Sequence, residues 1–126
     1  MIGTEWDLDQ GVIHHRCEGK ITLGDITKAL AGSVSHQNYE ATSGSVWDMR
    51  TGDFDVTHEG VRESVPTLQK IASTGRSDRR IAWVVEYETH VKVMENIYHE
   101  YPWASVWKVC KSIPEAVRFV TSENST

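Results

Sequence analysis

The sequence predicts an α/β fold with a mixed five-stranded sheet, in the order β-β-α-β-α-β-α-β-α. Two observations support this order. Short apolar runs typical of strands are separated by stretches of helical periodicity, and only the first two runs are joined by a tight turn. A tight turn joins antiparallel strands, whereas a helical crossover joins parallel ones. We therefore expect one domain over residues 1–126, an antiparallel hairpin followed by parallel β-α units.

The hairpin is predicted from alternating residues. Residues 4–9 alternate apolar and polar side chains, and Asp9-Gln10-Gly11 is a turn signal. Residues 12–19 form the second apolar run. Period-two alternation is typical of a strand with one face buried.

The first helix is predicted to begin after Thr22, because Thr22 and Asp25 have the spacing of a capping box. Apolar residues then recur along one helical stripe: Leu23, Ile26, Leu30 and Val34. A polar connection over 36–43 leads into the next strand. The sequence thus places a helix between the hairpin and the centre of the sheet.

The central strand is predicted over residues 44–50, which are apolar and end in charge. A loop over 51–56 follows, and Thr57 is a plausible N-cap for the second helix. Pro66 lies inside that helix and removes a backbone donor. We therefore expect a kink at Pro66, or a break with Ser64 capping the second half.

The rest of the chain repeats the same unit twice. Residues 79–87 contain a near-continuous apolar run, typical of a strand covered on both faces. Thr89 is predicted to cap a third helix that stops before Pro102, and residues 104–110 form the fifth strand. Ser112 to Glu115 is a capping box that starts the last helix. Residues 121–126 are a polar tail that we expect to fray.

Composition restricts the possible partners and the compartment. The 126 residues carry a formal net charge of -5 and no long basic run, which disfavours nucleic acid and anionic membranes. No window is apolar enough for a membrane span, and the first ten residues are too polar for a signal peptide. We therefore expect a cytoplasmic protein. Cys17 and Cys110 are expected to be reduced core thiols; the alternative is a disulfide between them.

Three tryptophans occupy similar places in successive predicted strands: Trp47, Trp83 and Trp107. If those strands are neighbours, the three side chains share one face of the sheet. Two interpretations are open. The tryptophans pack as core beneath helices, or they form an exposed aromatic face that serves a homodimer or a flat apolar ligand.

Candidate functional residues gather at the end of the central strand and in the loop after it. They are Asp48, Arg50, Thr51, Asp53, Asp55, Thr57 and His58. A helix N-terminus favours anions, so Thr57 is a candidate phosphorylation site; the alternative is a simple helix cap. The acidic residues of the loop with His58 allow cation binding or acid–base chemistry; the alternative is a solvated acidic loop.

Glu86 and His90 form a second candidate group, because they end the next strand and open the next helix. In a parallel sheet this junction lies beside the central loop. The sequence predicts neither metal nor cofactor. It has no Cys-x-x-Cys or His-Glu-x-x-His motif, and the glycine patterns of nucleotide-binding loops are absent as well.

The sequence resembles the SpoIIAA-like, or STAS/Sec14-type, bacterial domains. The resemblance rests on four stretches: Gly19–Thr22, Val46–Arg50, Arg80–Val85 and Val109–Val117. It implies a superhelix of β-α units with strands in near-sequential order. Anti-sigma-factor antagonists of this fold carry a phosphorylated serine at the start of the second helix. The matching stretch, 54–60, has no serine, and Thr57 stands in for it; the Sec14 side implies an apolar ligand.

Three functions follow from these observations, in order of preference. The first is a non-enzymatic signalling or regulatory module that binds a protein partner through the 50–58 loop and the second helix. The second is a carrier of a small apolar or lipid-like ligand. The third is an enzyme that uses His58 or His90 with Glu86.

Overall fold

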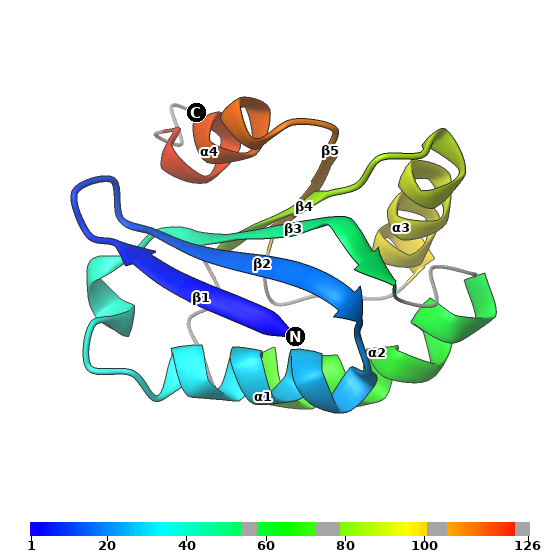
Figure 1. Cartoon of the computed structure of the whole chain (residues 1–126), viewed down its shortest axis with the longest axis horizontal. Coiled ribbons are helices and arrows are strands. Elements are labelled where there is room, and N and C mark those ends of the chain that lie inside the picture. The colour runs from blue at the N-terminus through cyan, green and yellow to red at the C-terminus, as the bar shows by residue number, and fades with distance from the viewer. Residues whose placement is uncertain (54–57, 73–78, 101–105, 123–126) are drawn as a thin grey trace.

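The computed structural model describes residues 1–53, 58–72, 79–100 and 106–122 (Figure 1). The strands are β1 Ile2–Asp7, β2 Val12–Lys20, β3 Gly44–Asp53, β4 Arg80–Val84 and β5 Val106–Cys110. The helices are α1 Leu23–Val34, α2 His58–Ala72, α3 Glu88–Glu100 and α4 Ile113–Thr121, with a short 3-10 helix at Tyr39–Ala41. The predicted α/β element order is confirmed.

The sheet follows the order of the chain, β1-β2-β3-β4-β5. β1 and β2 are antiparallel, and each later pair is parallel. Gly11 allows the hairpin turn, since its φ of 73° lies in the left-handed region. The predicted hairpin followed by parallel β-α units is therefore confirmed.

The helices divide unequally between the two faces of the sheet (Figure 1). α1, α2 and α3 pack on one face, where Ile26, Val65 and Ile97 join the core. α4 alone packs on the other face, where Ala116 and Val120 meet short side chains of the sheet. The sheet thus has one face under three helices and one that is covered only in part.

The tryptophan row lies in the core under the three helices. Trp47, Trp83 and Trp107 share one face, as predicted, with successive ring centroids 5.2 and 5.3 Å apart. Their exposed fractions are 1%, 5% and 7%. The interpretation as an exposed aromatic face is therefore wrong for this chain, and the argument for a homodimer drawn from it is removed.

The bounds of β1 and β3 differ from those predicted. β1 begins and ends two residues earlier than the predicted strand, because the turn occupies the residues after Asp7. β3 continues to Asp53, three residues beyond the predicted end. Thr51, Gly52 and Asp53 pair with the end of β2, so part of the predicted loop is strand. The long β2 supplies the backbone partners that keep these residues extended.

Two of the four predicted helix starts are confirmed with their caps. Thr22 and Asp25 form the predicted capping box of α1, and the Ser112 hydroxyl accepts the Glu115 amide hydrogen at the start of α4. α2 is continuous through Pro66, which is exposed, so the alternative of a break is wrong, and the alternative of a kink stays a prediction. α3 begins at Glu88, one residue before the predicted cap Thr89.

The remaining predictions concern the cysteines, the tail and membrane spans. Cys17 and Cys110 are free, buried and in core clusters on opposite faces of the sheet, which separates them. Thr121 still belongs to α4, and the rest of the predicted tail lies outside the described residues after Ser122. Within the described segments, no helix is long and apolar enough to cross a membrane.

Candidate functional site

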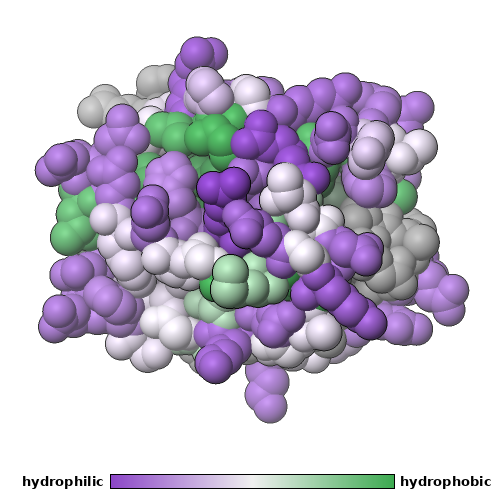
Figure 2. Space-filling view, in the orientation of Figure 1, coloured by the Kyte–Doolittle hydropathy of each residue, from purple (hydrophilic) through white to green (hydrophobic). Residues whose placement is uncertain are grey.

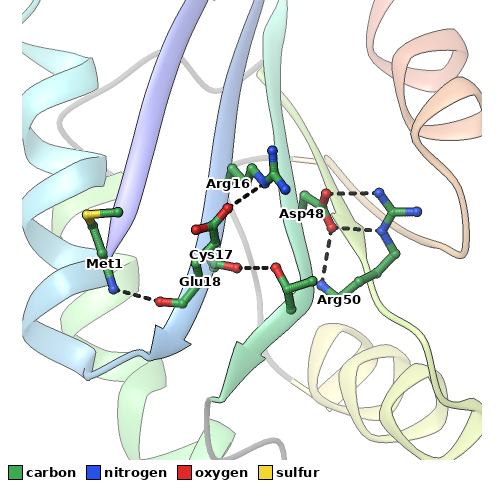
Figure 3. Close-up of polar contacts among 7 residues, drawn as sticks. Met1, Arg16, Cys17, Glu18, Asp48 and Arg50 are labelled. Atoms are coloured by element: carbon green, nitrogen blue, oxygen red, sulfur yellow. Dashed lines mark hydrogen bonds and ion pairs between the residues drawn. The ribbon is translucent and has the colours of Figure 1, made fainter.

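An ion pair near the carboxyl end of β3 is the best defined polar feature among the predicted site residues (Figure 3). Arg50 Nε and Nη2 each donate to a different carboxylate oxygen of Asp48, both at 2.9 Å. The Arg50 backbone amide also donates to Asp48 Oδ1, at 3.2 Å. Residues two apart on a strand point to the same face, so the strand itself brings these two side chains together.

Both partners of this pair are held in their charged forms. The hydrogen bond from Arg50 lowers the pKa of Asp48, and the bond to Asp48 raises the pKa of Arg50. The charge of Glu86 adds to the rise in the Arg50 pKa. Arg50, at the end of β3, and Glu86, between β4 and α3, are therefore near enough for their charges to interact.

A second ion pair lies on β2, beside the first (Figure 3). Arg16 Nε is 2.8 Å from Glu18 Oε1, and the two side chains are 69% and 46% exposed. The register between β2 and β3 shifts between Arg16 and Glu18. Nearby, the Thr51 hydroxyl donates to the Cys17 carbonyl at 3.0 Å, so the predicted site residue Thr51 ties the two strands together.

An open hollow of about 670 Å³ lies on the half of the sheet that α4 leaves bare. Its lining residues are Glu5, Trp6, Asp7, His14, His15, Arg16, Val46, Asp48 and Ile113. Among these, only Asp48 is a site residue predicted from the sequence. The signal for the others was the alternation of the first two strands, but it becomes informative only when β2 is known to lie beside β3.

A second hollow, of about 470 Å³, separates the edge strand β1 from α1. β1 contributes Ile2, Thr4 and Trp6, and α1 contributes side chains that include Ala29. The Trp6 ring stacks on His36 at one end, with centroids 4.0 Å apart. This groove was not predicted from the sequence.

Comparisons with known proteins identify the fold and not the family. No family model and no curated protein sequence matches the chain. It is similar to the crystal structure of an uncharacterised DUF3478-family protein from Shewanella loihica PV-4, described as having a SpoIIAA-like fold. The identity is 14%, the match covers 95% of this chain and 92% of the other, and the TM-score is 0.62.

The chain has a SpoIIAA-like fold. It is also similar to the unphosphorylated anti-sigma factor antagonist SpoIIAA, at 15% identity and a TM-score of 0.49, over 91% of this chain and 92% of the other. The match to the DUF3478-family protein confirms, for the architecture, the resemblance inferred from the sequence.

The remaining site residues predicted from the sequence lie at several different points of the fold. Asp53 ends β3 and is exposed. Asp55, Thr57 and the side chain of His58 lie outside the described residues. Glu86 is exposed after β4, and His90 lies in the first turn of α3, where its ring meets Tyr87 edge-on at 5.3 Å.

His15 is a buried polar group that the sequence analysis did not select. Its Nδ1 is 3.0 Å from the Thr4 hydroxyl, and its Nε2 is 3.4 Å from the Ser33 hydroxyl. Since Ser33 donates its one hydroxyl proton to the Ala29 carbonyl, His15 donates from Nε2 and accepts at Nδ1. Burial lowers the pKa of His15 to about 4, with a smaller contribution from His14, so the imidazole is neutral at pH 7.

The two thiols are poorly suited to nucleophilic chemistry. Burial raises the pKa of both Cys17 and Cys110 to about 11, and nearby carboxylates add to the rise. A thiol needs a lowered pKa to react readily as thiolate. Across the described ranges, no three His, Cys, Asp or Glu side chains are grouped so as to hold a metal ion. The arrangement offers fixed charge and hydrogen bonding.

Proposed function

We propose that this SpoIIAA-like chain is a non-enzymatic interaction module that docks a protein partner through the charged end of β3. The observation that carries the proposal is the Asp48–Arg50 pair. It is held by two hydrogen bonds of 2.9 Å, and 39% of the Arg50 side chain remains exposed. A preorganised exposed guanidinium suits a carboxylate-bearing surface and loses little rotamer freedom on binding.

The titration behaviour of the site supports binding over catalysis. A general acid or base works best with a pKa near the operating pH. At this site the pKa of Asp48 is lowered and that of Arg50 is raised, so both pKa values lie further from pH 7 than usual. The buried thiols are moved away from neutrality as well. These groups act as permanent charges or as core, which is what a docking surface requires.

The proposal includes the cytoplasm as the compartment and Thr57 as a switch. Two free buried cysteines on opposite faces of the sheet are compatible with a reducing environment. Thr57 immediately precedes α2, where an added phosphate would meet the positive end of the helix. Partner binding that is unchanged by both Thr57→Glu and Thr57→Ala would remove the switch from the proposal.

The docking proposal is tested by affinity capture with purified chain as bait. We expect the Asp48→Asn/Arg50→Gln double variant to lose its captured partner, because it lacks both the charges of the pair and the guanidinium group of Arg50. The control is Lys92→Gln/Glu95→Gln, which removes one charge of each sign from exposed positions of α3. Equal capture by wild type and the β3 variant would contradict the proposed site.

A second candidate function, carriage of a small apolar ligand, rests on Trp83. Its indole N–H is buried and has no hydrogen-bond acceptor among the described residues. A buried donor normally has a partner, and an apolar ligand with one carbonyl oxygen would supply it. Native mass spectrometry of host-purified protein tests this: an added mass that Trp83→Phe loses supports the carrier, and a bare chain mass contradicts it.

A further inference from the structure

The free edge of the sheet at β1 exposes backbone groups in a regular pattern. Met1 and Glu18 exchange two backbone hydrogen bonds, of 2.8 and 2.9 Å, across the β1–β2 pair. In an antiparallel ladder the bonded residues alternate, so Gly3, Glu5 and Asp7 also face β2. The N–H and C=O groups of the intervening residues Ile2, Thr4 and Trp6 therefore point to the open edge. In the part of the chain that the structure describes, no strand pairs with that edge.

The side chains of the same three residues line the groove against α1. Ile2, Thr4 and Trp6 face Asp25, Lys28, Ala29, Gly32, Ser33 and His36 across about 470 Å³. Gly32 leaves the wall of this groove open, because a Cβ there would meet nothing within 4 Å. A strand placed beside β1 would thus find hydrogen-bonding groups at its edge and a partly apolar groove under every second side chain.

The opposite side of β1 is acidic. Glu5 and Asp7 line the other hollow, and neither carboxylate has an ion-pair partner among the described residues. β1 itself, Ile-Gly-Thr-Glu-Trp-Asp, contains no basic residue. In Figure 2, which views the molecule as Figure 1 does with β1 in front, hydrophilic side chains predominate and a hydrophobic patch lies beside α4.

We propose that the β1 edge takes an extended peptide segment as a sixth strand, with basic side chains alternating with apolar ones. The apolar side chains enter the groove against α1, and the basic ones lie beside Glu5 and Asp7. Main-chain bonds to an edge give affinity, and alternate side chains give specificity. Opposite charges on neighbouring strands stabilise the pair, whereas like charges destabilise it.

Charge favours this partner over a second copy of the chain. Two β1 strands paired through Thr4 would place Glu5 of each beside Gly3 of the other and supply no cation on the acidic face. A segment with lysine at every second position supplies a cation to each carboxylate. The backbone edge and the groove do not include the charged end of β3, and only the hollow beside Glu5 and Asp7 is shared, through Asp48. The inference therefore does not depend on the docking site proposed above.

The test is fluorescence anisotropy with a labelled peptide, Lys-Val-Lys-Thr-Lys-Val-Lys, added to the full chain. A peptide of the same residues with its lysines grouped at one end is the control for simple charge attraction. For antiparallel addition, the bonded peptide residues are those whose side chains enter the groove. N-methylation at valine and threonine should therefore abolish binding, and N-methylation at lysine should spare it.

Three variants examine the surface from the protein side. Gly32→Leu fills the groove, Ile2→Pro removes one outward N–H without touching the ladder to β2, and Glu5→Lys reverses one charge. We expect each to weaken binding by about tenfold or more. Ala31→Leu, also exposed on α1, and Glu95→Lys on α3 should bind as wild type does. Gly32→Leu should remain folded, since leucine is the better helix former.

Several outcomes would overturn the inference. If the grouped-lysine peptide binds equally well, net charge alone explains the binding, and the proposed strand pairing is contradicted. Unchanged binding by Gly32→Leu would place the peptide elsewhere. Concentration-dependent self-association that Ile2→Pro abolishes and the peptide cannot displace would make the occupant a second copy. The Arg50→Gln variant should bind the peptide normally, because Arg50 lines neither the groove nor the hollow, and this separates the surface from the docking site.

Discussion

The two faces of the sheet are covered by different amounts of helix and filled with side chains of different size. Under α1, α2 and α3, the core includes Trp47, Trp83 and Trp107. Under the nine residues of α4, the sheet contributes Val12, Val46, Ala82, Val84 and Cys110. α4 packs on β3, β4 and β5 and meets β2 only at its start, where Val12 lies. The part of this face formed by β1, the rest of β2 and the end of β3 is therefore left to charged side chains (Figure 1).

The comparison separates stability from binding. Aromatic side chains bury the largest areas and contribute most to a core. The charged residues on the bare half, such as Arg16 and Arg50, form exposed pairs that contribute little to folding. We infer that the face under three helices holds the sheet together and the bare half is available to a partner.

The largest expected effect is the loss of a core tryptophan. Trp47→Ala should lower the free energy of unfolding by about 3–5 kcal/mol, since a fully buried aromatic ring is removed. Val46→Ala, the adjacent residue on the opposite face, should cost about 2 kcal/mol. Urea unfolding followed by circular dichroism measures both. If Val46→Ala costs as much as Trp47→Ala, the unequal roles of the two faces are contradicted.

The second effect is a loss of stability in acid. The unfolded chain protonates His15 below about pH 6.5, whereas the folded chain keeps it neutral until about pH 4. The unfolded state therefore binds more protons in this window, and stability falls as the pH falls through it. The full loss is about 3 kcal/mol. It is measured as the difference between wild type and His15→Gln in urea unfolding at pH 7 and pH 4.5; parallel pH profiles would refute the assignment.

Sequence patterns were sufficient for the fold because its signals are local. The Thr22–Asp25 capping box and the short hairpin turn depend on residues close in the chain. The length of β3 and the continuity of α2 depend on distant partners and on solvent. Thr51 to Asp53 stay extended because β2 lies alongside them. Pro66 is tolerated because it is exposed, which no local pattern records.

A third, smaller effect is expected at the open flank of α1. Gly32→Ala should raise the free energy of unfolding by about 0.5–1 kcal/mol, because alanine is the better helix former and the added Cβ meets nothing within 4 Å. Thermal melts measure the gain. Gly44→Ala is the contrasting control, since its Cβ would overlap the Arg80 carbonyl oxygen. A loss of stability in Gly32→Ala would show that the groove is already filled.

The smallest effect belongs to the bare half of the sheet. Arg16→Gln and Arg50→Gln should each change the free energy of unfolding by about 0–1 kcal/mol, because exposed ion pairs contribute little. Chemical denaturation at low and high salt measures the change. A larger loss in either variant would mean that the charged residues hold the fold together, which would weaken the case that they serve a partner.

The candidate site was predictable only in part. Asp48 and Arg50 were found because they end an apolar run, and the structure joins them in one ion pair. Glu5 and Asp7 were missed because their importance depends on which strand is left at the edge. The tryptophan row gave the right face but left two interpretations open, since the sequence does not record how many helices cover that face.

The sequential strand order also affects how the chain folds. Val12, Gly44, Arg80 and Val106 are successive register partners, each one β-α unit after the last. Each parallel pairing therefore closes a loop of one unit, and no pairing requires the two ends of the chain to meet. Loop-closure entropy rises with loop length, and long-range pairing slows folding. The sheet can therefore grow strand by strand from the β1–β2 hairpin, in the direction in which a ribosome delivers the chain.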